Sequence, residues 1–171
     1  MPAPTSPELD AFDLAILDIL QRDNTTPQRD IATAVHLSAA SVQRRIKRLR
    51  ETGVIRAEVA LLDASRLGRP LTMIVEVHVH DEHPLRTAGL RHRIATEPAV
   101  QQCYSVTGEA DYLLILCAAT MSDYDAITRR LFEGDENVRR FRTSVALGSI
   151  KEGMQVPLDV KAERWRQVTL G

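Results

Sequence analysis

The feature that most constrains the fold is a pair of short amphipathic segments at residues 27–52, joined by a tight turn. In the second segment, Val42, Ile46 and Leu49 recur at i, i+4 and i+7, which is the spacing of one helix face. Ser38 stands directly before this segment as a predicted N-cap. Two short helices joined in this way are the components of a helix-turn-helix, a motif that enters the major groove of DNA.

The sequence on either side extends this motif into a small domain. Residues 11–22 carry apolar residues at helical spacing behind Asp10, a predicted N-cap. Thr26 and Pro27 predict the start of the next helix, with Thr26 as its cap and proline at its first position. Apolar residues in 54–62 predict two short strands, which would form the wing of a winged helix-turn-helix.

Positive charge is concentrated on the third predicted helix. The chain of 171 residues has a net charge of −1, yet residues 41–56 hold six Lys and Arg against Glu51 alone, a local net charge of +5. A basic stripe in a nearly neutral chain indicates a defined surface for phosphate contacts. The pattern alone also fits a solvated, charged helix in a generic three-helix module.

The exposed side of this helix is the predicted DNA-binding surface. Residues near the N-terminus of a recognition helix reach base edges, which favours Ser41, Gln43 and Arg44, because Arg pairs with guanine and Gln with adenine. Lys47, Arg48 and Arg50 are better placed for phosphates, which position the protein without specifying sequence. The candidate DNA-binding residues are Ser38, Ala40, Ser41, Gln43, Arg44, Arg45, Lys47 and Arg48.

The hydrophobic period changes after a Gly/Pro/Arg-rich stretch at residues 64–70, which predicts a domain boundary. The order of elements that follows is βαββαβ, the ferredoxin-like arrangement. The predicted elements are a strand at 71–79, a helix at 84–96, strands at 100–106 and 111–119, a helix at 122–132 and a strand at 138–147. In the helix at 84–96, Leu85, Leu90 and Ile94 are predicted to face inward. Ser122 is predicted to cap the helix at 122–132.

One face of the predicted sheet is apolar and is not packed against a helix. A βαββαβ unit places both helices on the same face and leaves the other bare. Ile74 lies on that bare face, and the strand at 111–119 is apolar on both faces. Because a bare apolar sheet is most simply covered by a second copy, the sequence predicts a homodimer, which also suits paired DNA half-sites.

The turn between the two central strands is the candidate effector site. Gly108 allows positive φ and a close approach of backbone to ligand. Backbone N–H groups of the turn could hold a carboxylate, while Glu109 or Asp111 could hold an ammonium group. The alternative is a bulged hairpin in which Asp111 only caps the turn. The candidate effector-binding residues are Thr107, Gly108, Glu109, Ala110 and Asp111.

Neither metal nor cofactor is expected. Cys103 and Cys117 lie in apolar strand-like segments and are predicted to be buried free thiols. His78 and His80 would share a strand face and form a possible metal pair, but nothing completes a four-ligand set, so solvent-facing histidines are the preferred interpretation.

The sequence argues against other classes of protein. No Ser/His/Asp arrangement and no Gly-rich phosphate loop stand out, so the chain is not expected to be an enzyme. No apolar run approaches the ~18 residues of a membrane span. The amino terminus lacks the basic and apolar regions of a signal peptide, which favours a cytoplasmic, nucleoid-associated protein.

Three blocks of sequence resemble the Lrp/AsnC family of regulators, also called feast/famine regulators. LDAFDLAILDILQRD resembles the family's opening helix, LSAASVQRRIKRLRETGVI its helix-turn-helix, and VTGEADYLLIL the turn of its effector domain. The resemblance covers about residues 9–157. The chain departs from the family at His36, where glycine is usual before the third helix, and in a tail that runs past the usual end.

This resemblance implies a transcriptional regulator that binds double-stranded DNA. It further implies homodimers that commonly assemble into octamers, and an amino acid or related metabolite bound near contacts between dimers, where it changes assembly or DNA affinity. Sirohaem decarboxylase subunits resemble the same family, so an enzyme on this scaffold is one alternative. A second alternative is an architectural DNA-binding protein without an effector.

The expected fold class is therefore α+β, with a winged helix-turn-helix followed by a ferredoxin-like ligand-binding domain. The predicted divisions are a disordered tail at 1–8, the DNA-binding domain at 9–63, a linker at 64–70, the effector-binding and oligomerisation domain at 71–157, and a carboxy-terminal extension at 158–171.

Overall fold

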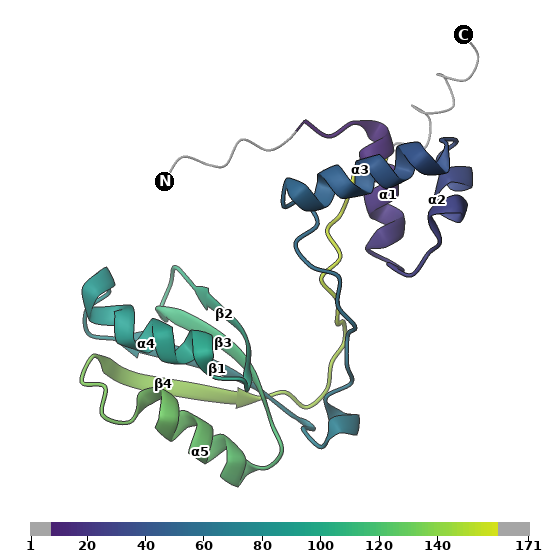
Figure 1. Ribbon diagram of the computed structural model, residues 1–171. Helices are drawn as coiled ribbons and strands as arrows, with labels where there is room; N and C mark the ends of the chain where they lie inside the picture. The colour runs from purple at the N-terminus through teal and green to yellow at the C-terminus, as the bar shows by residue number, and fades with distance from the viewer. Residues whose placement is uncertain (1–7, 161–171) are drawn as a thin grey trace. The chain divides into compact units, whose positions relative to one another are not determined.

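The computed structural model describes residues 8–160, which fall into two compact units. The first unit holds the chain up to Ala60 together with the segment that begins at Glu152, and the second holds Leu61–Lys151 (Figure 1). Each unit has a hydrophobic core of its own. The predicted tail at 1–8 and extension at 158–171 lie outside the described residues, apart from Glu8 and residues 158–160.

Three helices form the first unit: α1 (Ala11–Leu20), α2 (Gln28–Ala34) and α3 (Ala39–Glu51). Their order and the turn between α2 and α3 confirm the predicted helix-turn-helix. The helices meet in a compact apolar core because each contributes one buried face. The buried residues of this core are Ile16, Ile31, Ala32, Val35, Val42 and Ile46.

The turn between α2 and α3 is closed by local backbone geometry. His36 has a φ of 55°, so it occupies the left-handed region that a glycine would occupy at less cost. Ser38 then caps α3, as predicted, by accepting a hydrogen bond from the Ser41 N–H at 3.1 Å. These two residues fix where the recognition helix begins.

The start of α2 differs from the prediction by one residue. Pro27 itself is the N-cap, with an extended ψ of 140°, and the helix begins at Gln28. The reason lies in the preceding turn, where the Thr26 hydroxyl donates to the Asp23 carbonyl at 2.8 Å and is not used as a cap.

The predicted wing strands are wrong. Residues 54–62 form no strand, and Val59, Leu61 and Leu62 are exposed. Only Ile55 packs against the core of the first unit, with its N–H bonded to the Leu49 carbonyl at 2.9 Å. A two-stranded ribbon is marginal by itself, and no neighbouring strand in residues 8–160 pairs with this segment.

The carboxy-terminal segment returns to the first unit. The Gln21 side-chain amide donates to the Val156 carbonyl at 3.1 Å and accepts from the Val156 N–H at 3.0 Å. This two-way pairing gives the returning backbone a partner at the end of α1.

The second unit is a four-stranded antiparallel sheet with two helices, preceded by a short 3-10 turn at Ser65–Leu67. The strand order is β2-β3-β1-β4, which confirms the predicted βαββαβ arrangement. The elements are β1 (Leu71–Val79), α4 (Pro84–Thr96), β2 (Val100–Ser105), β3 (Tyr112–Ala118), α5 (Met121–Phe132) and β4 (Val138–Val145).

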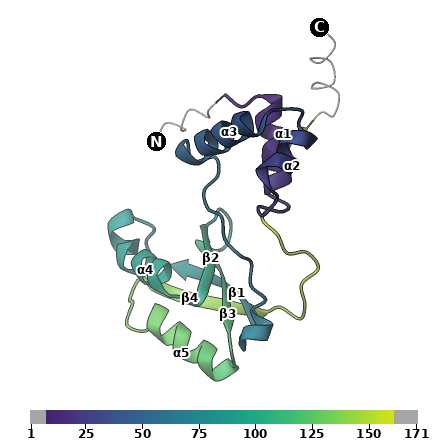
Figure 2. The ribbon, with the colours of Figure 1, turned by 45° about the vertical axis from the view of Figure 1, so that its right-hand side comes forward.

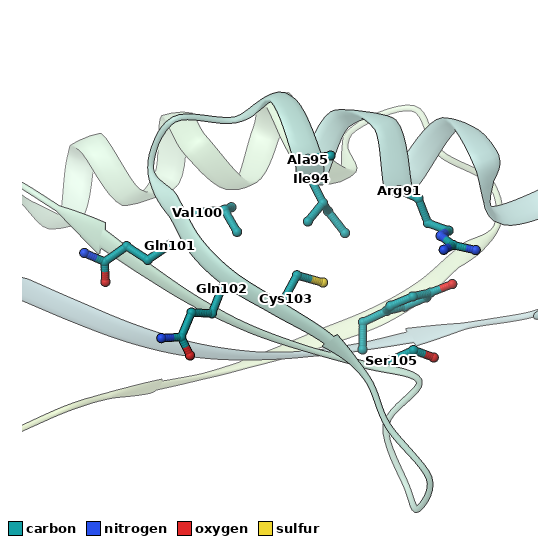
Figure 3. A pocket seen from close by; sticks show the side chains of 9 residues that line it. Arg91, Ile94, Ala95, Val100, Gln101, Gln102, Cys103 and Ser105 are labelled. Atoms are coloured by element: carbon teal, nitrogen blue, oxygen red, sulfur yellow. The ribbon is translucent and has the colours of Figure 1, made fainter. Parts of the chain in front are cut away.

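Both helices of the second unit lie on one face of the sheet (Figures 2 and 3). Met73, Val75 and Val77 of β1 are fully buried in the core beneath them. Residues that alternate with these point to the other face, where Ile74 is 37% exposed opposite Ile115 of β3. The sheet therefore has one covered face and one open face.

Three predictions about single residues in this unit are wrong. Leu85 was expected to face inward but is exposed in the first turn of α4. Cys103 is exposed because β2 is an edge strand, whereas Cys117 in central β3 is buried as predicted. Helix α5 is capped by Thr120, whose hydroxyl accepts the Asp123 N–H at 3.0 Å, so Ser122 lies inside the helix.

Candidate functional site

The recognition helix α3 is held by an apolar face and a buried charge. Val42 and Leu49 are fully buried, and Ile46 nearly so. On the neighbouring face, Arg45 and Arg48 both reach Asp13 of α1, whose side chain is completely buried. Asp13 was not among the residues predicted from the sequence, although an acidic residue within the apolar stripe of α1 indicates the need for a cationic partner.

The charged groups of this cluster lie within hydrogen-bonding distance, and the two arginines share the Asp13 carboxylate. Arg45 Nη1 lies 2.9 Å from Asp13 Oδ1 and 2.7 Å from Asp10 Oδ2, while Arg48 Nη2 donates to Asp13 Oδ2. The Arg45 guanidinium also lies over the Phe12 ring, 5.5 Å from its centroid. A buried carboxylate with two guanidinium partners has its charge compensated, so the α1–α3 packing depends on all three residues.

Asp10 contributes as a helix cap as well as an ion-pair partner. It forms a capping box with Asp13, in which each side chain accepts the other residue's N–H, at 2.8 and 3.2 Å. Partial burial alone would raise the pKa of Asp10, but the hydrogen bonds from the Asp13 N–H and from Arg45 outweigh it and lower that pKa. The carboxylate therefore stays charged at neutral pH.

The structure divides the predicted DNA-binding residues into two groups. Arg45 and Arg48 are turned toward α1 by Asp13, and Ser38 and Ser41 are engaged in the helix cap. Arg44 has no ion pair within residues 8–160, and Lys47 Nζ lies 3.7 Å from Glu51. The members that are exposed and lie outside the α1 contact and the cap are Ala40, Gln43, Arg44 and Lys47.

The candidate effector turn connects β2 to β3. Thr107, Gly108 and Glu109 are exposed, and Gly108 has a φ of 136° with open space where a Cβ would lie. At the end of the turn, Asp111 is fixed to β1: its N–H donates to the Val77 carbonyl at 3.0 Å, and its Oδ2 accepts the Val79 N–H at 2.7 Å. Asp111 thus has a structural role in addition to any role toward a ligand.

A cavity that the sequence did not predict lies between α4 and the edge strand β2 (Figure 3). It measures about 320 Å³, and Arg91, Cys103 and Tyr112 are among its lining residues. Although Cys103 counts as exposed, its thiol is partly desolvated by the cavity lining, which raises its pKa, and the positive charge of Arg91 opposes this shift. The thiol is therefore protonated at neutral pH and a poor nucleophile.

One histidine differs from expectation, and two agree with it. His78 is fully buried, not solvent-facing as predicted, whereas His80 and His83 are exposed. Within the described part of the chain, no group of three or more His, Cys, Asp or Glu residues is arranged to hold a metal ion. In the same residues, no helix is both long and apolar enough to span a bilayer.

A helix-turn-helix with a basic recognition helix, joined to a βαββαβ unit with an exposed glycine turn, defines a DNA-binding regulator with a ligand-binding domain. The chain belongs to the Lrp/AsnC family of transcriptional regulators. Residues 9–56 match the model of a winged helix-turn-helix DNA-binding domain, and residues 72–156 match that of the Lrp/AsnC ligand-binding domain.

Known proteins resemble the chain over most of its length. The leucine-responsive regulatory protein of Rhizobium meliloti is 33% identical, over 88% of this chain and 97% of its own. An AsnC family regulator from Agrobacterium tumefaciens has a TM-score of 0.83 at 32% identity, covering 90% and 99%. The regulator NMB0573 of Neisseria meningitidis, solved as a complex with L-methionine, has a TM-score of 0.82 at 26% identity, covering 89% and 98%.

The buried carboxylate gives a stability prediction. Replacing Asp13 with Asn (Asp13→Asn) leaves Arg48 without its carboxylate partner and should lower the free energy of unfolding of the first unit by about 2–4 kcal/mol. Asp18→Asn, which removes a surface partner of Arg22 on the same helix, should cost no more than about 1 kcal/mol. Urea titrations of both variants measure the difference, and equal losses would contradict the central role of Asp13.

Proposed function

We propose that this regulator reads DNA through the exposed side chains of α3 and that an amino acid bound at the turn 107–111 changes its DNA affinity or assembly. The main support for this proposal is that the ion pairs of Asp13 hold α3 against α1 while Gln43, Arg44 and Lys47 stay exposed. Gln43 and Arg44 are assigned to base edges, and Lys47 to phosphates. As a DNA-binding protein it acts on the nucleoid, in the cytoplasm.

The effector proposal is supported by the backbone of the turn. Exposed Gly108 admits a ligand close to the main chain, where N–H groups can hold an α-carboxylate. The acidic side chain of Glu109 is available to an α-ammonium group. The Neisseria relative solved with L-methionine supports an amino acid as the class of ligand.

The assembly proposal is supported by the open face of the sheet. Ile74 is exposed there, and Leu113 and Ile115 are partly exposed, so this face carries apolar surface that the two helices of the unit do not cover. A second copy packed on this face buries that surface and presents two α3 helices to paired half-sites. We propose that such homodimers assemble further into octamers.

Base contacts and phosphate contacts are separable by mutation. On a duplex selected from random sequences, Arg44→Ala should weaken binding by about 1–3 kcal/mol and relax base preference. Lys47→Ala should weaken binding to selected and random duplexes alike and reduce the salt slope by about 1. Titrations at two salt concentrations test both, with Arg129→Ala in the second unit as a control. If both variants affect selected and random DNA equally, the assignment is wrong.

The effector turn is tested by filling the space above its glycine. Gly108→Trp should abolish the response to L-methionine, measured by calorimetry, while DNA binding persists. Gly134→Trp is the matched control, because Gly134 also has positive φ and open space at its Cβ but lies after α5. Unchanged methionine binding by the Gly108 variant would refute the site. If wild type binds none of the twenty amino acids, the effector proposal fails.

The dimer is tested by charging the open face. Ile74→Lys should shift the protein toward monomer in light scattering after gel filtration, because a buried interface would then hold an unpaired charge. Leu85→Lys, on the exposed side of α4, should leave the mass unchanged. A wild-type mass retained by the Ile74 variant would contradict an interface on this face.

A further inference from the structure

The buried imidazole of His78 is unsatisfied. His78 lies near the end of β1 and is fully buried, yet neither ring nitrogen has a hydrogen-bond partner. Among residues 8–160 it is the one buried side chain with polar atoms left in this state. A neutral imidazole carries one donor and one acceptor, and leaving them unpaired costs free energy, so such a group calls for an explanation.

His78 belongs to the open face of the sheet. Its neighbours Val77 and Val79 face the core beneath the helices, so His78 between them faces the opposite side. The two hydrogen bonds of Asp111 bracket this position, one at Val77 and one at Val79. The base of the effector turn is therefore fixed directly beside His78.

The effector turn also reaches across β1 on this face. Glu109 Oε2 lies 4.0 Å from Arg142 Nη1 of β4, and β1 separates β3 from β4 in the sheet. Arg142 is in register with Glu76, two residues from His78 and on the same face. In Figure 3 the loop after Ser105 lies on the side of the sheet opposite α4, as this contact requires. The turn thus passes over the histidine.

This contact is a weak one. At 4.0 Å it is an ion pair without a hydrogen bond, and the side chains of Arg142 and Glu109 are 62% and 86% exposed. Exposed pairs of this kind contribute about 0–1 kcal/mol. A ligand with complementary charges can therefore open it at little cost.

We infer that His78 is a carboxylate-binding residue of the effector site, reached when a zwitterionic amino acid separates Glu109 from Arg142. The inference rests on the proposed function and adds a side-chain contact to it. The α-ammonium group pairs with Glu109, and the α-carboxylate takes the place of the Glu109 carboxylate beside Arg142. There the carboxylate accepts a hydrogen bond from the His78 ring N–H.

The charges around His78 favour this orientation of the ligand. Arg140 lies opposite His78 in the register of β1 and β4 and has no ion pair within the described residues. Together with Arg142 it places two guanidinium groups on the β4 side. The nearby acidic groups are Glu76, Glu109 and Asp111, and the Asp111 carboxylate, on the β3 side, already accepts the Val79 N–H. A carboxylate is thereby drawn toward β4 and His78, and an ammonium group toward Glu109.

The test compares two ligands that differ only in the carboxylate. Calorimetry would measure the binding of L-methionine and of L-methioninol, in which the carboxylate is replaced by a hydroxymethyl group. His78→Phe keeps a ring of similar size but removes both nitrogens, and should weaken methionine binding about tenfold, the equivalent of one charge-assisted hydrogen bond. Its effect on methioninol should be small, so the preference for methionine shrinks.

Two further variants serve as controls. His80→Phe changes the exposed histidine two residues away and should bind both ligands as wild type does. His78→Gln restores an N–H donor and should recover part of the preference for methionine. Because the His78 nitrogens have no partners, His78→Phe should not lower the melting temperature. If the Phe variant is nevertheless destabilised, the comparison of binding is made with His78→Gln.

The outcomes separate this inference from the effector proposal. If the wild type binds methionine and the His78→Phe variant keeps the full preference for methionine over methioninol, the role of His78 is overturned. The proposal for the effector turn then still stands. A Gln variant with no recovered preference also counts against a donor role. Wild type that binds no amino acid overturns both proposals together.

Discussion

The arrangement of the DNA-binding unit depends on one buried carboxylate. Asp13 has no access to water, and Arg45 and Arg48 neutralise it from the neighbouring helix. Hydrophobic packing draws α1 and α3 together, but packing alone tolerates rotation of a helix, whereas paired charges have a definite geometry. The direction in which Gln43 and Arg44 project is therefore set by the contacts that α3 makes with α1.

Periodicity was sufficient to predict the helices, the βαββαβ order of elements along the chain and the inward face of α3. Those features follow from local patterns, and the structure confirms them. The partners of Arg45 and Arg48 could not be predicted in this way, because a basic side chain has the same sequence signature whether it meets a phosphate or a carboxylate. Only the spatial neighbour, Asp13, 32 and 35 residues away, distinguishes the two.

The same limit applies to the second unit. The glycine turn was predicted as a candidate site, but the burial of His78 was not, because alternation assigns a face without showing what lies over it. The contact between Glu109 and Arg142 supplies that information, since it joins segments that are distant in sequence. The prediction of wing strands was wrong for a related reason, because strand propensity in 54–62 gives no strand without a partner to pair with.

The pairing of Gln21 with Val156 has a consequence for how the protein is made. In topological terms the second unit is an insertion within the first, because residues 152–160 rejoin the helices that precede it. On the ribosome the three helices emerge first, but their last backbone contact forms only after the whole sheet unit has been synthesised. The amino-terminal unit is thus the first to begin folding and the last to be completed.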